Sequence, residues 1–124
     1  MAFMMRAVAG LYIAAGATMI AQSAMAAGAV VSASDKTVLF WSVHKPSEEI
    51  AVGAAMSQCG ARFGNDCMVE KSFSHGCIAV ARSNSHRRWG YAWRPWPGPA
   101  RNAAMEACDA TGSHSCAIQT TSCE

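Results

Sequence analysis

Ala54-Ala55-Met56-Ser57-Gln58-Cys59 is a run of mostly small residues that ends in a cysteine, and Cys67 follows after seven more residues. The chain repeats this pattern 49 residues later, as Ala103-Ala104-Met105-Glu106-Ala107-Cys108 followed by Cys116. Self-similarity at a constant spacing indicates a repeated structural unit. We therefore expect a fold built from two similar units, each containing an alanine-rich helix and a pair of cysteines.

Residues 1–26 have the features of an export signal. Arg6 supplies a positive charge, an uncharged apolar run extends from residue 7 to residue 20, and Ala24-Met25-Ala26 places small residues where signal peptidase cleaves. The apolar run is short for a membrane span of about 20 residues, and no charged stop follows it. We therefore expect a signal peptide that is cleaved after Ala26, and no transmembrane anchor.

The predicted cleavage changes the size and charge of the protein. Removal of 26 of the 124 residues leaves 98, which is the size of a single exported domain at residues 27–124. The net charge falls from +2 to +1, because Arg6 is the only charged residue in the signal. A nearly neutral domain has no global field to hold nucleic acid, so we expect no nucleic-acid partner.

The exported part contains all six cysteines of the chain. An even number of cysteines in a short exported domain predicts a disulfide framework, which compensates for a small core by restricting the unfolded chain. The repeat favours three pairs: Cys59 with Cys67, Cys108 with Cys116, and Cys77 with Cys123. The alternative keeps the symmetry but exchanges partners between the two copies, and the sequence alone does not decide between them.

The first half of the exported part predicts a strand, a helix and two further strands. Residues 27–36 are small, polar and unpatterned, and we expect a loose lead-in there. Residues 37–43 are rich in β-branched and aromatic side chains, which favour a strand. Ser47 is the expected N-cap of the following helix, and Gly60 its expected end. Residues 67–73 and 77–82 then predict two strands joined as a hairpin at residues 74–76.

The second half predicts a strand at residues 89–93, a helix with Pro99 at its first position and its end near Ala110, and a strand at residues 116–121. The order β-α-β-β-β-α-β predicts an α+β domain stabilised by disulfides. In this prediction two pseudo-repeated β-α-β units, at about residues 37–82 and 89–123, form one mainly antiparallel sheet. Both helices cover one face of that sheet.

Several motifs in this order resemble a known family. They are the strand Trp89-Gly90-Tyr91-Ala92-Trp93, the helix motif Ala103-Ala104-Met105 with Cys108 and Cys116, and the strand Cys77-Ile78-Ala79-Val80-Ala81. Together they are similar to exported bacterial proteins grouped as domain of unknown function 4189. The resemblance covers about residues 38–123 and implies export and disulfides, but it supplies no catalytic residues. The stretch at residues 94–99 departs from the family by being richer in proline and tryptophan.

Candidate catalytic and metal-binding residues are few. His75 and His114 each precede a cysteine by two positions, but structural zinc sites use close cysteine pairs that this chain lacks. We therefore expect no metal and no cofactor. No cysteine is left over as a nucleophile and no Gly-x-Ser-x-Gly motif is present, so we predict that the protein is not an enzyme. A carboxylate pair of the glycosidase type stays open, because its spacing cannot be read from a sequence.

Residues 86–96 combine aromatic and basic side chains, and they hold three of the four tryptophans. Tryptophan and arginine are the residue types that most often anchor interfaces. Alternation along the strand predicts that Trp89 and Trp93 fill the core beneath the helices. Trp96 lies between two prolines and is harder to bury. We therefore predict a binding surface formed by the side chains of Arg87, Arg88, Arg94 and Trp96.

These observations predict an exported binding domain located in the periplasm or outside the cell. Its expected partner is an envelope protein, such as a lytic enzyme that the domain inhibits as an inhibitor or immunity protein. The first alternative is a module that binds cell-wall glycan, because stacked arginine and tryptophan side chains also suit sugars. The second alternative is a small envelope hydrolase.

Overall fold

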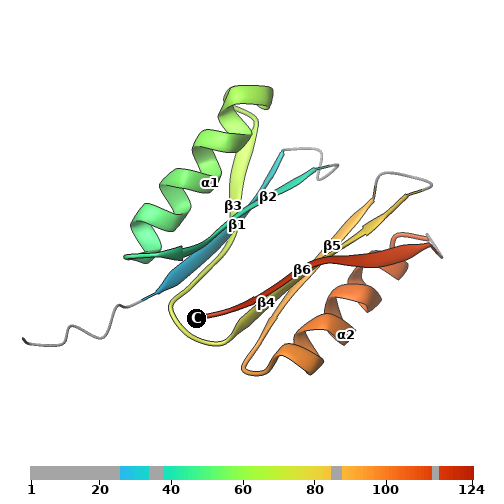
Figure 1. Ribbon diagram of the computed structural model, residues 1–124. Coiled ribbons are helices and arrows are strands. Elements are labelled where there is room, and N and C mark those ends of the chain that lie inside the picture. Colours follow the sequence, from blue (N-terminus) through green and yellow to red (C-terminus); the bar gives the residue numbers. More distant parts are fainter. Residues whose placement is uncertain (1–25, 34–37, 85–87, 113–114) are drawn as a thin grey trace, which may run out of the picture.

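The computed structural model describes residues 26–33, 38–84, 88–112 and 115–124 (Figure 1). The predicted export signal, apart from Ala26, lies outside these residues. The elements follow one another as β1 (Ala27–Ala33), β2 (Leu39–Lys45), α1 (Glu48–Phe63), β3 (Cys67–Phe73), β4 (Cys77–Ser83), β5 (Trp89–Arg94), α2 (Pro97–Asp109) and β6 (Cys116–Cys123). The protein is therefore α+β, as predicted.

The strands form two antiparallel three-stranded sheets, with the orders β2-β1-β3 and β5-β4-β6. Each sheet with its helix is one unit of the form strand-strand-helix-strand. Both units carry a register shift at the same place, between Val30 and Val31 in one and between Val80 and Ala81 in the other. The internal repeat thus extends to sheet topology, with one strand more in each unit than the predicted β-α-β arrangement.

The prediction of one sheet with both helices on the same face is wrong. The two sheets face each other, and α1 and α2 lie on the two opposite outer sides (Figure 1). Residues 74–76, which we expected to form a hairpin, instead connect β3 of the first sheet to β4 of the second. Each sheet is apolar on both faces, so one face packs on its helix and the other on the partner sheet.

Three apolar clusters form the resulting layers. One lies under α1, and its buried members are Ala29, Val31, Ala51, Ala55 and Cys59. The second lies under α2 and contains Cys77, Ala79, Ala81, Ala92, Ala100, Ala104 and Cys108. The third lies between the sheets, where Val30, Leu39, Phe73, Ile78 and Val80 pack with partly buried tryptophans. Trp89 and Trp93 belong to this third cluster, so they fill the space between the sheets and not the core beneath a helix.

The prediction of a loose lead-in at residues 27–36 is also wrong, because β1 is the central strand of the first sheet and all its residues are buried. A strand buried on both faces shows no alternation of apolar and polar residues, so the usual signal is absent. Its small side chains also allow close packing on both sides. A Cβ atom on Gly28 would lie 2.5 Å from the Phe73 ring.

Local sequence signals predicted both helices correctly but gave the wrong residue for some of the helix ends. Ser47 caps α1 as predicted, and its hydroxyl accepts a hydrogen bond from the Ile50 amide at 3.2 Å. The helix continues past Gly60 to Phe63, and Gly64 ends it with a φ of 60°. Such a left-handed conformation favours glycine, which explains why Gly64 and not Gly60 is the stop. In α2 the first position is taken by Pro97 and not by Pro99.

Three disulfides connect the elements, and they are the pairs that the repeat favours. Cys59–Cys67 and Cys108–Cys116 each join the end of a helix to the strand that follows it. Cys77–Cys123 joins β4 to β6 within the second sheet, where the two residues are directly opposite each other. The two short links therefore fasten each helix to its own sheet, and the long link closes most of the second unit.

Candidate functional site

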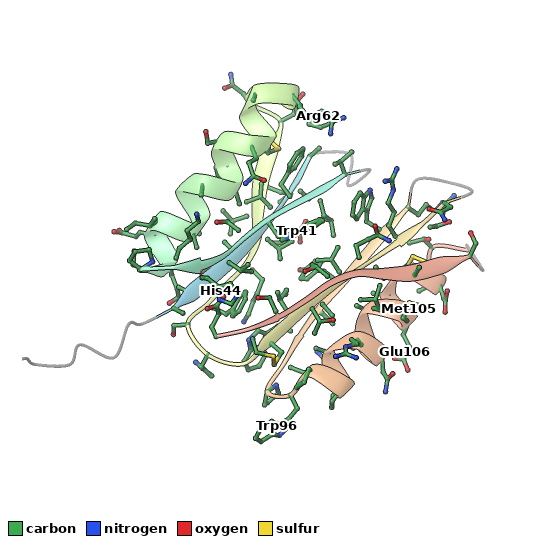
Figure 2. The ribbon with its side chains drawn as sticks, in the orientation of Figure 1. Trp41, His44, Arg62, Trp96, Met105 and Glu106 are labelled. Carbon is green, nitrogen blue, oxygen red and sulfur yellow. A yellow bond between two sulfur atoms is a disulfide. The ribbon has the colours of Figure 1, made fainter. Side chains whose placement is uncertain are left out.

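The structure separates the residues of the predicted binding surface. Arg88 donates a hydrogen bond to the carbonyl of Thr111, just beyond the end of α2. Trp96 is the N-cap of the same helix, and its side chain is 71% exposed at the opposite end (Figure 2). A helix of 13 residues is about 20 Å long, so these two side chains do not form one patch. Arg87 lies outside the described residues.

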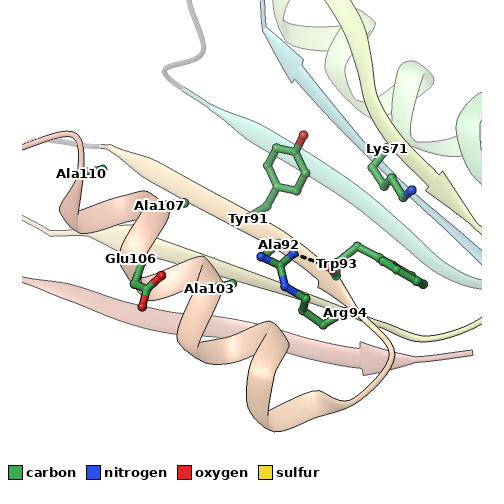
Figure 3. Close-up of a pocket in the computed structure, with 9 residues that line it drawn as sticks. All are labelled: Lys71, Tyr91, Ala92, Trp93, Arg94, Ala103, Glu106, Ala107 and Ala110. Atoms are coloured by element: carbon green, nitrogen blue, oxygen red, sulfur yellow. Dashed lines mark hydrogen bonds between the residues drawn. The ribbon is translucent and has the colours of Figure 1, made fainter.

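Arg94 leads to a better candidate site. It ends β5, and one of its guanidinium nitrogens donates a 2.7 Å hydrogen bond to the carbonyl of Trp93. Its side chain lines a groove of about 690 Å³ (Figure 3). The other lining residues come from β3, β5 and α2: Lys71, Tyr91, Ala92, Trp93, Ala103, Glu106, Ala107 and Ala110.

This groove crosses the free edge of β5. In the sheet order β5-β4-β6, β5 pairs with β4 on one side and is the outer strand on the other. Tyr91 and Trp93 point to the space between the sheets, whereas Ala92 packs in the cluster under α2. Because side chains of both faces of the strand line the groove, the groove lies along the strand edge itself. We call it the β5 groove.

Hydrogen bonds hold the aromatic wall of the β5 groove. The Trp93 indole Nε1 donates to the carbonyl of His75 at 2.8 Å, and the Lys71 ammonium lies 5.0 Å from the Trp93 ring centre. The Tyr91 hydroxyl donates to Glu70 Oε2 at 3.2 Å. Glu70 Oε1 in turn accepts a 2.6 Å hydrogen bond from the Ser32 hydroxyl. These bonds link the two sheets and give the groove a preformed shape.

Burial raises the pKa of Tyr91 above its ordinary value of 10.0, and the charge of Glu70 and its hydrogen bond raise it further. The neutral phenol is thus favoured in the folded state, so this contribution to stability is present below pH 10 and is lost as pH rises through the folded pKa. We expect Tyr91→Phe to reduce the loss of stability that occurs as pH rises above about 10.

Denaturant unfolding of the two proteins at several pH values measures this effect. A direct check is also available, because Tyr12 and Tyr91 are the two tyrosines of the chain and Tyr12 lies in the predicted signal. In the protein cleaved after Ala26, the absorbance of tyrosinate therefore reports Tyr91 alone. A midpoint at or below the ordinary value of 10.0 would contradict the expectation.

The first unit has a similar groove on the equivalent strand. It encloses about 410 Å³ and lies along β2, the outer strand of the order β2-β1-β3, with Val38, Leu39, Phe40, Trp41, Gln58, Arg62, Arg82 and Trp89 as its lining. Arg82 lies 5.1 Å from the Trp89 ring centre, and its Nε is buried without a hydrogen-bond partner among the described residues. We call this the β2 groove.

The β2 groove is the more basic of the two. Arg62 and Arg82 line it, and none of its described lining residues is acidic. The Arg62 guanidinium lies 5.4 Å from the Phe63 ring centre and 5.9 Å from that of Phe40, so aromatic rings hold this charge in place. Sequence reasoning missed both grooves. The internal repeat is the signal that could have helped, because it indicates that a groove along the outer strand of one unit has a counterpart in the other unit.

Residues 27–123 match the family described as Domain of unknown function (DUF4189). The chain belongs to the DUF4189 family. No curated protein and no solved structure matches the DUF4189 chain significantly.

Two further properties of this DUF4189 domain bear on its site. Within the described ranges, no three side chains of His, Cys, Asp or Glu lie close enough together to hold a metal ion. Neither of the helices that the structure describes is long and apolar enough to cross a membrane.

Proposed function

We propose that this DUF4189 protein is an exported recognition domain that binds an extended segment of another protein along its edge strands. The observation that carries the proposal is the recurrence of a groove on the free edge of β5 and of β2. Both units have a groove on their outer strand although the side chains that line the two grooves differ. The grooves would act by binding, without turnover.

Strand addition is the recognition mode that suits these edges. An outer strand has unpaired backbone amides and carbonyls, which an extended peptide can pair with as an additional strand. Two alanines of α2, Ala103 and Ala107, and its C-cap Ala110 line the β5 groove and leave room for the side chains of such a peptide. Trp93 and Tyr91 offer rigid aromatic surface on the other side, which is typical of anchoring positions.

The charges of the grooves favour an acidic segment. Arg62 and Arg82 line the β2 groove, and Lys71 and Arg94 line the β5 groove together with one acid, Glu106. Complementary charge raises the rate of association and selects among partners. The predicted signal and the three disulfides support a partner in the cell envelope, such as a lytic enzyme that the domain would inhibit.

Selection of displayed random peptides, long enough to cover the six residues of β5, tests this proposal. We expect selected peptides to be extended and acidic. Changing both Lys71 and Arg94 to Glu should weaken their binding by about tenfold or more, because two attractive charges become repulsive. Arg101→Glu is the matched control, since Arg101 lies on α2 and its Nε donates to Thr121, outside the groove lining.

Backbone methylation of a selected peptide separates strand addition from other binding modes. Methyl groups on alternate amides remove the donors that pair with an edge strand, whereas all side chains stay the same. We expect binding to be lost for one alternating set of positions and kept for the other. Equal binding by both methylated forms and the parent peptide would show that β5 is not extended by the ligand.

A second candidate function rests on Trp96, which is the most exposed large apolar side chain described. An exposed indole suits stacking on a sugar ring, as in a module that binds cell-wall glycan. Sedimentation with purified peptidoglycan distinguishes the two candidates. A glycan-binding module should enter the pellet and lose this property in Trp96→Ala, whereas a protein-specific domain should stay in the supernatant.

A further inference from the structure

His44, Ser122 and Glu124 form a hydrogen-bonded chain where the two units meet. His44 belongs to β2 of the first unit, Ser122 to β6 of the second, and Glu124 follows β6 directly. The Ser122 hydroxyl lies 3.2 Å from His44 Nε2, and Glu124 Oε2 lies 3.2 Å from His44 Nδ1. These contacts join residues that are 78 and 80 positions apart, which is why sequence reasoning did not find them.

The hydrogen-bond partners indicate which ring nitrogen of His44 carries the proton. A carboxylate only accepts hydrogen bonds, so the proton of the neutral His44 ring is on Nδ1, where Glu124 accepts it. His44 Nε2 then carries a lone pair and accepts the hydrogen bond from the Ser122 hydroxyl. A serine, a histidine base and an acid that orients the base are the parts of the activated serine of hydrolases.

The surrounding backbone holds the three side chains in place. Glu124 Oε1 accepts a 2.7 Å hydrogen bond from the His44 amide, so both oxygens of the carboxylate bind the same residue. The Glu124 amide donates to the carbonyl of Gly76 at 2.9 Å. Between Ser122 and Glu124, Cys123 is fastened to Cys77 by a disulfide. The serine and the acid are therefore fixed to the second sheet.

A β-bulge directs His44 to this position. Ala27 and Ala29 of β1 are opposite Lys45 and Ser42 of β2, so β2 has one residue more than its partner in this interval. His44, with a φ of 57°, is the only non-glycine residue with positive φ among the described ones. The equivalent pair of strands in the second unit, β4 and β5, is regular from Cys77 to Arg82. Bulges often re-aim a side chain next to a functional site.

The serine is a second departure from the repeat at the same point. In the first unit Phe73 lies opposite Gly28, and in the second unit Ser122 occupies the corresponding position opposite Ile78. Phe73 is buried between the sheets as an apolar side chain. The repeat shows that neither the bulge nor a serine is needed to build a unit. Both changes bring polar groups together, which favours a role of the trio beyond folding.

Exposure differs among the three residues. The His44 side chain is 65% exposed, whereas the Glu124 side chain has no exposed surface. Ser122 is buried, with 9% of its surface exposed. A small substrate would approach Ser122 from the side of the exposed His44 ring, while the acid is protected from solvent.

We propose that Ser122 and His44 are catalytic residues of an esterase site and that Glu124 is the residue that positions His44. Ser122 Oγ attacks the carbonyl carbon of a small carboxylic ester, and His44 Nε2 takes the hydroxyl proton. The bond to the alcohol breaks, the alcohol leaves with the proton from His44, and the acyl group stays on Ser122. Water then attacks this ester with His44 again as base, which releases the acid and restores Ser122.

The proposed substrates are esters of good leaving groups. A positioned base contributes about 10²–10⁴-fold to a rate, which serves small acyl esters far better than amides. This inference is independent of the two grooves, because none of the three residues lines either of them. It departs from the prediction that the protein is not an enzyme, which rested on the pairing of all cysteines and on the lack of a local serine motif.

A fluorophosphonate probe and p-nitrophenyl acetate test the proposal on the purified, oxidised full chain. We expect the probe to label Ser122, located by mass spectrometry of the digested protein, and the acetate to be turned over. Both should be lost in Ser122→Ala and reduced about 100-fold in His44→Asn. Asparagine tolerates the left-handed conformation of His44, so this variant removes the base with little change in backbone preference. Ser57→Ala, at an exposed helical serine, should react like the wild type.

Glu124→Gln separates positioning from a structural role. The amide can still accept from the His44 backbone, but it no longer favours the productive ring orientation. We expect kcat to fall about tenfold or more with KM unchanged in protein that is folded by circular dichroism. A purely structural latch would lower Tm in these variants and show no turnover in the wild type. Folded wild type that is neither labelled at Ser122 nor active on the acetate would overturn the proposal.

Discussion

Gly90→Ala is expected to lower the free energy of unfolding by about 3 kcal/mol or more, which is at the upper end of the usual cost of overpacking. A Cβ atom at this position would meet the backbone nitrogen of Cys108 and lie 2.6 Å from the carbonyl oxygen of Ala104. These are backbone atoms of α2, which cannot move without displacing the helix. Gly90 is thus the point where helix and strand come closest. Denaturant unfolding under oxidising conditions measures the change.

Gly53→Ala is the matched control for this substitution. Gly53 lies in α1, and an added Cβ would have no atom within 4 Å. Alanine in a helix is favoured over glycine by about 0.5–1 kcal/mol, so this variant should be slightly more stable than the wild type. If Gly90→Ala unfolded at the same denaturant concentration as the wild type, the close contact between β5 and α2 would be wrong.

Replacing both Cys77 and Cys123 by alanine is expected to cost about 4 kcal/mol, the largest loss among the three disulfides. The reason is loop length. Cys77 and Cys123 are separated by 46 positions, and the restriction of the unfolded chain grows with the length of the closed loop. Unfolding of the oxidised variant and wild type in denaturant measures the difference.

The pair Cys108 and Cys116 is the comparison for this experiment. It closes a loop with a separation of 8, so its double alanine variant should lose only about 2.5 kcal/mol on the same relation. A smaller loss for the long loop than for the short one would contradict the chain-entropy account. The long disulfide also borders Ser122 and Glu124, so its removal should reduce the proposed esterase activity even in molecules that remain folded.

The sequence alone predicted the elements that depend on local signals. The cap at Ser47 and the end of the second helix near Ala110 follow from neighbours a few residues apart. The alternation in the strand from Trp89 to Trp93 also follows, because successive side chains of a strand point to opposite faces. The repeat added the favoured disulfide pairs, since equivalent cysteines in two similar units have equivalent partners.

The candidate sites are different, because residues distant in sequence form them. The β5 groove combines Lys71 of one unit with Arg94 and Glu106 of the other. The esterase site needs His44 and Ser122, which meet only when the two sheets pack. Even the predicted surface residues Arg88 and Trp96, close in sequence, are separated by the length of α2. Proximity along the chain was therefore a poor guide to proximity in space.

By itself the sequence predicted the secondary structure of most of the domain, because this follows from short-range periodicity, and similarity at a constant spacing indicated the repeat and favoured one set of disulfide pairs. Only the tertiary structure decided that β1 is a central strand, that the strands divide into two facing sheets, and that grooves lie on their edges. The physical reason is that the pairing of strands depends on the burial of whole sheet faces. A strand that is covered on both faces has no alternation of apolar and polar residues, so its sequence does not indicate which strands it pairs with.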